Sequence, residues 1–135
     1  MTSIEKTNIK IIIADDHDVF RKHIKNLIIH KNLAEKIDEA VNGIELIKNL
    51  EKNKYDIVLL DISMPEMDGL AALEVIKERF PDLKILVLTM HYEDSYKKRV
   101  KEKGADGFIL KTQIFDNIFK AIEAIMSGKK YFIDS

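Results

Sequence analysis

The sequence contains no cysteine, no tryptophan and only two prolines among its 135 residues. Without cysteine the chain has no disulfide scaffold, no thiol nucleophile and no cysteine-ligated zinc site. Charge of neither sign is in excess, because 22 Lys and Arg residues stand against 23 Asp and Glu residues, for a net charge of −1. The overall charge therefore does not indicate a partner such as nucleic acid or an anionic membrane.

Long hydrophobic runs are also missing. No segment approaches the roughly 20 apolar residues needed to cross a bilayer, and the start of the chain, Met1–Lys10, has no apolar core of signal-peptide length. We therefore expect a cytoplasmic protein with no membrane partner. A hydrophobic content of 46% and a charged content of 33% are typical of a single globular domain with a core of its own.

Short apolar runs alternate with longer amphipathic segments. The runs resemble strands buried on both faces of a parallel sheet, strongly at Ile11–Ala14, Ile57–Leu60 and Ile85–Leu88 and more weakly at Lys36–Val41 and Gly107–Leu110. Apolar residues at helical spacing follow each run, over residues 20–28, 44–50, 73–80, 96–100 and 114–125. This alternation predicts an open parallel sheet of five strands with helices on both faces.

Polar side chains that could bind a ligand or take part in a reaction follow four of the five predicted strands. Asp15 and Asp16 follow the first strand, Asp61 the third, Thr89 the fourth and Lys111 the fifth. Ligands of such sheets bind outside the carboxyl ends of the strands, so we expect these side chains to share one site. Three neighbouring carboxylates stay ionised together only beside a cation, and oxygen ligands of this kind suit Mg²⁺ or Mn²⁺.

The same side chains could assemble a site for phosphoryl transfer. Asp61 would be the nucleophile that forms an aspartyl phosphate, while the metal and Lys111 neutralise the transferring group and the Thr89 hydroxyl donates to its oxygens. An Asp or Thr that follows a strand is more commonly a turn or helix-cap residue. That simpler interpretation would have to account for three acids, a hydroxyl and a lysine at one edge of the sheet.

Two other features have simpler interpretations. His17, His23 and His30 are spread along the first helix, and without cysteine partners they do not predict a transition-metal site. The last helix has more apolar residues than one core-facing stripe requires. Either all of them pack against the sheet or the tail, or some form a patch for a partner or a second copy.

Four stretches carry a family resemblance: Ile11–His17, Asp56–Leu70, Ile85–Thr89 and Gly104–Lys111. Over about Ile9–Ser127 the chain resembles the receiver domain of bacterial two-component response regulators. Details resemble the NarL/LuxR-like subgroup, namely Thr89–His91, Gly104–Phe108 and Gly128–Phe132. The resemblance implies an α/β, flavodoxin-like (CheY-like) fold, a doubly wound five-stranded parallel sheet built as (βα)5 with strand order 2-1-3-4-5.

The resemblance also implies a role for each site residue. Asp61 corresponds to the phosphoacceptor and Lys111 to the invariant lysine of the family. Thr89 corresponds to the switch hydroxyl and Phe108 to the switch aromatic residue. The expected ligands of Mg²⁺ (or Mn²⁺) are Asp15, Asp16, Asp61 and the backbone carbonyl of Ser63, and the residues expected to flank the site are Ser63, Met64 and His91.

The function implied is a phosphorylation-dependent switch rather than an enzyme that turns over external substrates. A sensor histidine kinase would phosphorylate Asp61, and the surface over the fourth helix, fifth strand and fifth helix would change. A homodimer could form through that surface or through the fifth helix. The expected output is transcription, through a DNA-binding domain absent from this chain.

Other functions remain open at this point. The chain could be a stand-alone single-domain receiver that acts by protein contact, or a degenerate receiver. An Asp-nucleophile phosphatase is disfavoured, because Ser63 stands where that class has a second acid. A flavodoxin-like cofactor module is disfavoured, because no phosphate-binding loop follows the first strand.

One departure from the family pattern concerns the residue after the lysine. Most receivers have a cis-proline there, whereas Thr112 follows Lys111. We expect a trans bond, since a cis bond before a non-proline residue costs roughly 2.5–4 kcal/mol. For the domain boundaries, we predict an N-terminal extension at 1–8, the receiver domain at 9–128 and the start of a linker or C-terminal tail at 129–135.

Overall fold

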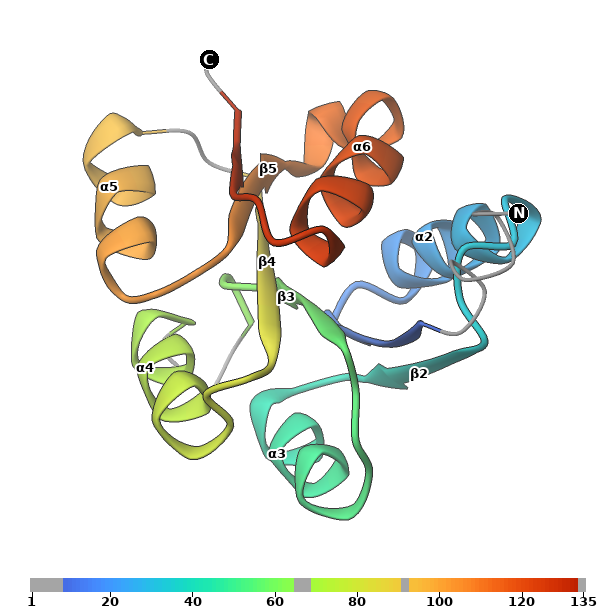
Figure 1. Ribbon diagram of the computed structural model, residues 1–135, viewed down its shortest axis with the longest axis horizontal. Helices are drawn as coiled ribbons and strands as arrows, with labels where there is room; N and C mark the ends of the chain where they lie inside the picture. The colour runs from blue at the N-terminus through green and yellow to red at the C-terminus, as the bar shows by residue number, and fades with distance from the viewer. Residues whose placement is uncertain (1–8, 65–68, 91–92, 134–135) are drawn as a thin grey trace.

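Strands and helices alternate along the chain in a computed structural model that describes residues 9–64, 69–90 and 93–133 (Figure 1). The strands are β1 (Lys10–Ala14), β2 (Lys36–Ala40), β3 (Ile57–Asp61), β4 (Lys84–Thr89), β5 (Gly107–Leu110) and β6 (Tyr131–Phe132). The helices are α2 (Asp18–His30), α3 (Gly43–Lys52), α4 (Gly69–Arg79), α5 (Asp94–Glu102) and α6 (Ile114–Met126), with a 3-10 turn, η1 (Lys111–Gln113). The N-terminal extension expected at 1–8 lies outside the described residues.

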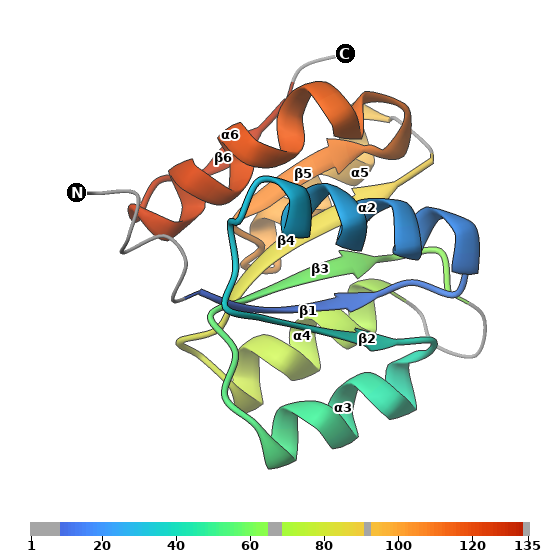
Figure 2. The ribbon, with the colours of Figure 1, turned by 90° about the vertical axis from the view of Figure 1, so that its right-hand side faces the viewer.

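All strands pair in parallel in one sheet of order β2-β1-β3-β4-β5-β6. Helices α2 and α6 cover one face of this sheet, and α3, α4 and α5 cover the other (Figure 1). In Figure 2 the strand arrows point in one direction, so the carboxyl ends of the strands lie along one edge. The predicted doubly wound, flavodoxin-like fold is confirmed, and so is the predicted order of its first five strands.

The predicted number of strands was too low by one, because the segment expected to be a linker or tail contributes β6. The Tyr131 N–H donates to the Asp106 carbonyl at 2.9 Å, and the Ile133 N–H donates to the Phe108 carbonyl at 3.3 Å. Gly107 permits this close approach, since a Cβ there would lie 2.9 Å from the Tyr131 carbonyl oxygen. A strand of two residues is too short to show an alternating pattern in the sequence.

The core consists of two hydrophobic layers, one on each face of the sheet. Alternate residues of each strand point to opposite faces, so within β1 Ile12 joins the layer under α3, α4 and α5, while Ile11 and Ile13 join the layer under α2 and α6. All five residues of β3 are buried. Burial on both faces explains why these strands are continuous apolar runs in the sequence.

The apolar residues of α6 belong mostly to the core. The helix buries Ile114, Ile118, Ala121, Ile122 and Ile125, and Phe119 and Met126 pack at the margin of the same layer. Phe115 is the exception in this helix, with 52% of its surface exposed. Packing therefore accounts for most of the apolar excess noted in the sequence. A homodimer through this helix remains a prediction.

The bond between Lys111 and Thr112 is trans, as expected from the missing proline, and η1 begins at this lysine. Within the described part of the chain, no helix is both long and apolar enough to cross a membrane.

Candidate acidic site at the carboxyl edge of the sheet

The two central strands bring two carboxylates side by side. Asp61 is the last residue of β3, and Asp15 directly follows β1. Ala14 pairs with Leu60 in the adjoining strands, so Asp15 and Asp61 leave the sheet next to each other. Both carboxylates are completely buried, with an exposed fraction of 0%. Burying two like charges together is costly unless a positive charge compensates them.

Lys111 supplies a positive charge at this position. Its ammonium nitrogen lies 2.8 Å from Asp15 Oδ2 and 3.2 Å from Asp61 Oδ2. Only 4% of the Lys111 side chain is exposed, and the ammonium lies 4.6 Å from the centroid of the Phe20 ring. This cation–π contact and the two carboxylates hold the ammonium in place.

The Asp61 carboxylate is fixed and is difficult to ionise. Its Oδ1 accepts the Ser63 N–H at 2.9 Å, within a turn that follows β3. Burial raises the pKa of Asp61, and the charge of Asp15 raises it further, while the Ser63 hydrogen bond and Lys111 oppose these effects. A further positive charge beside Asp61 would favour its ionised form.

Gly69 keeps that turn in place from the start of α4. A Cβ at Gly69 would lie 2.4 Å from the Ile62 Cβ and 2.5 Å from the Ile62 carbonyl oxygen. Because no side chain fits between these backbones, the first turn of α4 packs directly against the residue that follows Asp61.

The next two residues after Asp15 complete a cluster of donor atoms. Asp15, Asp16, His17 and Asp61 each offer one ligand atom, and all four atoms lie within 4.8 Å of one another. The buried oxygens Asp15 Oδ2, Asp16 Oδ1 and Asp61 Oδ2 have no aligned hydrogen-bond donor among the described residues. The Lys111 ammonium neutralises two of them by proximity, without an aligned hydrogen bond. A divalent cation fits this donor set.

The sequence analysis missed His17. The residue occupies the position before α2 without capping it through its side chain. Its Nδ1 lies 3.2 Å from Asp15 Oδ1, 3.4 Å from Asp16 Oδ1 and 3.9 Å from Asp61 Oδ2. Its position directly after Asp15 and Asp16 in the chain was the signal in the sequence that could have identified it.

A second unpredicted residue, Arg21, supports the site from α2. Its guanidinium donates to the Asp15 carbonyl at 2.7 Å, to Asp18 at 2.6 Å and to Glu39 at 2.7 Å. Burial alone would raise the pKa of Glu39, but hydrogen bonds from Arg21 and Lys25 outweigh burial and lower it to about 2. The loop that carries Asp15 is thereby tied to both α2 and β2.

The remaining predicted residues lie in different surroundings. Thr89 ends β4 and is buried, which places it at the same edge of the sheet as Asp61. Phe108 is already fully buried in β5, so any switching movement would be a rearrangement within the core. The Met64 side chain belongs to the core, whereas Ser63 is exposed. His91 lies outside the described residues.

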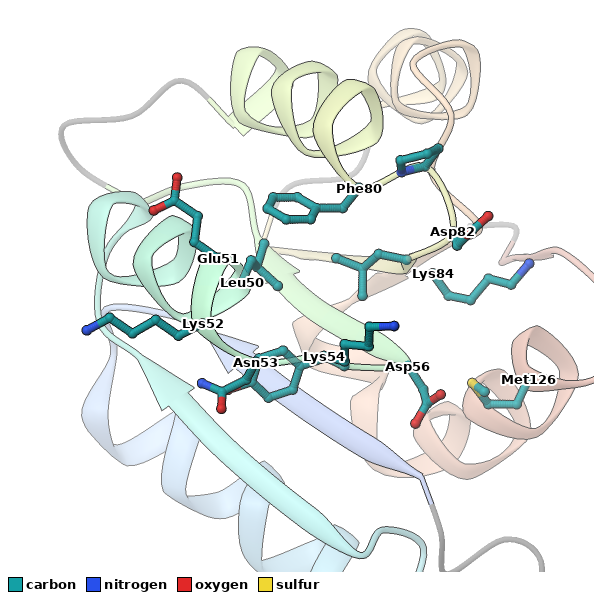
Figure 3. A pocket seen from close by; sticks show the side chains of 13 residues that line it. Leu50, Glu51, Lys52, Asn53, Lys54, Asp56, Phe80, Asp82, Lys84 and Met126 are labelled. Atoms are coloured by element: carbon teal, nitrogen blue, oxygen red, sulfur yellow. The ribbon is translucent and has the colours of Figure 1, made fainter.

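A cavity of about 720 Å³ lies at the opposite, amino end of β3 and β4 (Figure 3). Its lining mixes charges of both signs, among them Lys54, Asp82 and Lys84. The Asp56 carboxylate in this lining already accepts the Lys10 N–H at 2.8 Å. The cavity is therefore separate from the acidic cluster and does not resemble it chemically.

Curated relatives align with most of this chain. It is 32% identical over 128 residues to the transcriptional regulatory protein DegU of Brevibacillus brevis, covering 95% of this chain and 54% of that protein. It is 36% identical over 123 residues to the oxygen regulatory protein NreC of Staphylococcus carnosus, covering 90% and 57%. The chain thus spans just over half the length of these relatives.

Solved structures agree with this likeness. The isolated receiver domain of RcsB from Salmonella enterica serovar Typhimurium, with the phosphomimetic BeF3−, matches at a TM-score of 0.88 and 30% identity, covering 95% of each chain. A LuxR-family response regulator from Aurantimonas matches at a TM-score of 0.86 and 27% identity, covering 93% of this chain and 89% of that one.

The profile of the response regulator receiver domain matches residues 11–123. The fold, the relatives and this match agree. The chain therefore belongs to the response regulator receiver domain family, in its NarL/LuxR-like branch, and is a signalling domain of the two-component type.

Proposed function

We propose that this domain is a phosphorylation switch in which Asp61 accepts a phosphoryl group from the phosphohistidine of a sensor kinase. The observation that supports this most directly is the contact of the Lys111 ammonium with the carboxylates of both Asp61 and Asp15. An ammonium held between the two acids can neutralise the oxygens of an incoming phosphoryl group.

The proposed transfer exchanges one bond for another. A carboxylate oxygen of Asp61 attacks phosphorus, and the new P–O bond forms as the P–N bond to the kinase imidazole breaks. The leaving imidazole takes up a proton from water. The Ser63 N–H orients the attacking carboxylate through its Oδ1. Mg²⁺ bound by Asp15, Asp16, Asp61 and the Ser63 carbonyl would supply charge neutralisation.

The response of the fold would start at Thr89. In this proposal the Thr89 hydroxyl moves to donate to the phosphoryl oxygens, and Phe108 shifts into the space that Thr89 leaves. Val87 of β4 pairs with Phe108 of β5, so the two strands are in direct register here. Because Phe108 also pairs with Phe132 of β6, its movement would reach the surface formed by α5, β5 and α6.

The output that we propose is control of transcription through a DNA-binding domain beyond this segment. DegU is a transcriptional regulator, and RcsB has been solved bound to promoter DNA in the presence of BeF3−. Since the relatives are nearly twice as long as the matched part, this output belongs to the whole protein. The alternative is a stand-alone receiver that acts by protein contact.

Phosphorylation can be tested with a small phosphodonor. Incubation with acetyl phosphate and Mg²⁺ should add the mass of one phosphoryl group, as measured by intact-protein mass spectrometry, and Asp61→Asn should abolish the addition. Asp82→Asn is the matched control, because this exposed acid lies at the amino end of β4 and should leave the addition unchanged. No added mass on the native chain, or retained addition in the Asp61 variant, would refute the proposal.

A further inference from the structure

We propose that Phe20 is a positioning residue for the phosphoryl transfer. Its ring holds the Lys111 ammonium at the site while the carboxylates beside that ammonium are engaged by a divalent cation or by phosphorus. The inference rests on the proposed function, because it concerns the same reaction at Asp61. It is argued from the geometry of the ring and the ammonium, from the exclusion of water from their contact, and from the competition for the carboxylates.

The topology separates Lys111 from the acids that it contacts. Lys111 directly follows β5, whereas Asp15 follows β1 and Asp61 ends β3, and β4 lies between β3 and β5. The lysine side chain therefore has to reach past the end of β4 to place Nζ 2.8 Å from Asp15 Oδ2 and 3.2 Å from Asp61 Oδ2. Phe20, in the first turn of α2, meets the ammonium there, with Nζ 4.6 Å from the centroid of its ring.

This contact is closer and better shielded from water than the similar contacts elsewhere in the described part of the chain. In those contacts the ammonium lies 5.3–5.9 Å from the ring centroid and the lysine is exposed, at Lys31 over Phe119, Lys36 over Tyr55 and Lys101 over Phe132. Only 4% of the Lys111 side chain is exposed. The attraction between a cation and a ring is stronger where water does not compete for the cation.

The carboxylates that attract the ammonium are also the groups that the reaction uses. Asp15 and Asp61 are expected ligands of Mg²⁺, and Asp61 loses its charge when it forms the P–O bond. Both changes weaken the attraction of these acids for Lys111, and a divalent cation beside them also repels the ammonium. Its other polar neighbour, His17 Nδ1 at 3.3 Å, belongs to the same cluster of donor atoms. The Phe20 ring has no charge to lose, so its attraction for the ammonium persists.

A purely structural role for Phe20 is the alternative, because the half-buried ring also packs at the margin of the layer under α2 and α6. Phe119 provides a matched comparison. It is half-buried at the margin of the same layer and has the Lys31 ammonium over its ring. Lys31 follows the last residue of α2, so this contact lies at the end of the helix away from the acids.

The test replaces Phe20 with phenylalanine analogues that carry one, two or three fluorine atoms on the ring. Fluorine withdraws charge from the face of the ring while nearly preserving its shape, so the attraction for a cation falls and the packing stays. Incubation with acetyl phosphate and saturating Mg²⁺, followed by intact-protein mass spectrometry over time, gives the rate of phosphorylation. We expect the rate to fall with each fluorine, to about one tenth with three. The same series at Phe119 should leave the rate unchanged.

A second measurement reports the position of the lysine without any reaction. Protons above an aromatic ring resonate upfield, so the Cε protons of Lys111 should have an upfield NMR signal, assigned by its absence in Lys111→Met. We expect the upfield shift to persist when Mg²⁺ is added. Phe20→Tyr, which keeps a ring, should retain the shift, and Phe20→Leu should abolish it.

Three results would overturn the inference. A rate that is constant along the Phe20 series, or that falls equally along the Phe119 series, would leave Phe20 a packing residue and the proposed function intact. The same conclusion would follow if the Lys111 signal returned to its ordinary position on addition of Mg²⁺. If the native chain took up no phosphoryl group, the proposed function would fail, and the role of Phe20 would fail with it.

Discussion

Lys111 carries its charge into a position from which water is largely excluded. Its only close counter-charges among the described residues are Asp15 and Asp61. Removing one member of such a buried group leaves the other charges uncompensated, which costs more than the group contributes to stability when complete.

Replacing Lys111 with methionine should therefore lower the free energy of unfolding by about 3–5 kcal/mol in metal-free buffer. The two buried carboxylates would then repel each other without a neighbouring cation. Added Mg²⁺ should recover much of the loss, because an ion that binds only the folded state stabilises it. Urea unfolding with and without Mg²⁺ measures both effects.

Lys120→Met is the control for this substitution, since Lys120 is an exposed residue of α6. It should change the free energy of unfolding little under either condition. A Lys111→Met variant as stable as the native chain without metal would show that the ammonium does not compensate these acids.

The sequence was sufficient to predict that Asp15, Asp16, Asp61 and Lys111 share one edge, because parallel strands deliver their carboxyl ends to the same side. It was not sufficient for His17 or Arg21. The direction of the His17 ring depends on the backbone at the start of α2, and Arg21 becomes a buried partner only once β2 brings Glu39 across from it. Such long-range contacts leave no local pattern.

At the scale of elements, the Arg21–Glu39 pair ties α2 to β2. Glu39 has a pKa of about 2 against an ordinary value of 4.5. A carboxylate with a depressed pKa stabilises the fold fully above its unfolded pKa and loses that contribution as pH falls towards its folded pKa. The contribution of Glu39 should thus be complete above about pH 4.5 and should decline between there and pH 2.

We expect Glu39→Gln to lower the free energy of unfolding by about 2 kcal/mol at pH 6, where the charged hydrogen bonds of Glu39 are complete. The difference from the native chain should shrink as the pH is lowered to 3. Urea unfolding across this range provides the measurement. Glu35→Gln, at an exposed position, should show no such trend, and a difference that stayed constant with pH would contradict the assignment.

The elements themselves differ in how well the sequence predicted them. β1, β3 and β4 are continuous apolar runs because both of their faces are covered, and this pattern is visible without a structure. β6 is held instead by backbone hydrogen bonds. Its close approach to β5 is possible because Gly107 has no side chain. Backbone pairing of this kind does not depend on a recognisable choice of residues.

At the scale of the whole molecule, β6 covers the outer side of β5 and becomes the short edge strand of the sheet. Lys130 forms an ion pair with Asp106 at 2.8 Å, the Tyr131 hydroxyl donates to Asn117 at 2.6 Å, and the Lys97 ammonium donates to the Ile133 carbonyl at 3.0 Å. These contacts join the segment after α6 to α5, α6 and the loop before β5. An open edge strand invites pairing with another chain.

Ending the chain after Gly128 should therefore quicken amide hydrogen exchange in β5 and promote self-association. Exchange followed by mass spectrometry and size-exclusion chromatography with light scattering measure the two effects. Tyr131→Phe is the control, because it removes the hydroxyl contact with Asn117 and keeps the backbone pairing. Unchanged exchange in β5 after the truncation would show that β6 does not protect this edge.

The parallel direction of all six strands also has a practical consequence for labelling. The polypeptide runs through β1 and β6 in the same direction (Figure 2), from the rim that holds the cavity towards the rim at which Asp61 ends β3. A fluorescent reporter fused after β6 would begin near the rim that holds the acidic cluster. A reporter fused before β1 would begin at the opposite rim. The fusion after β6 is therefore better placed to respond to chemistry at Asp61. The fusion before β1 is better placed to leave Asp61 undisturbed.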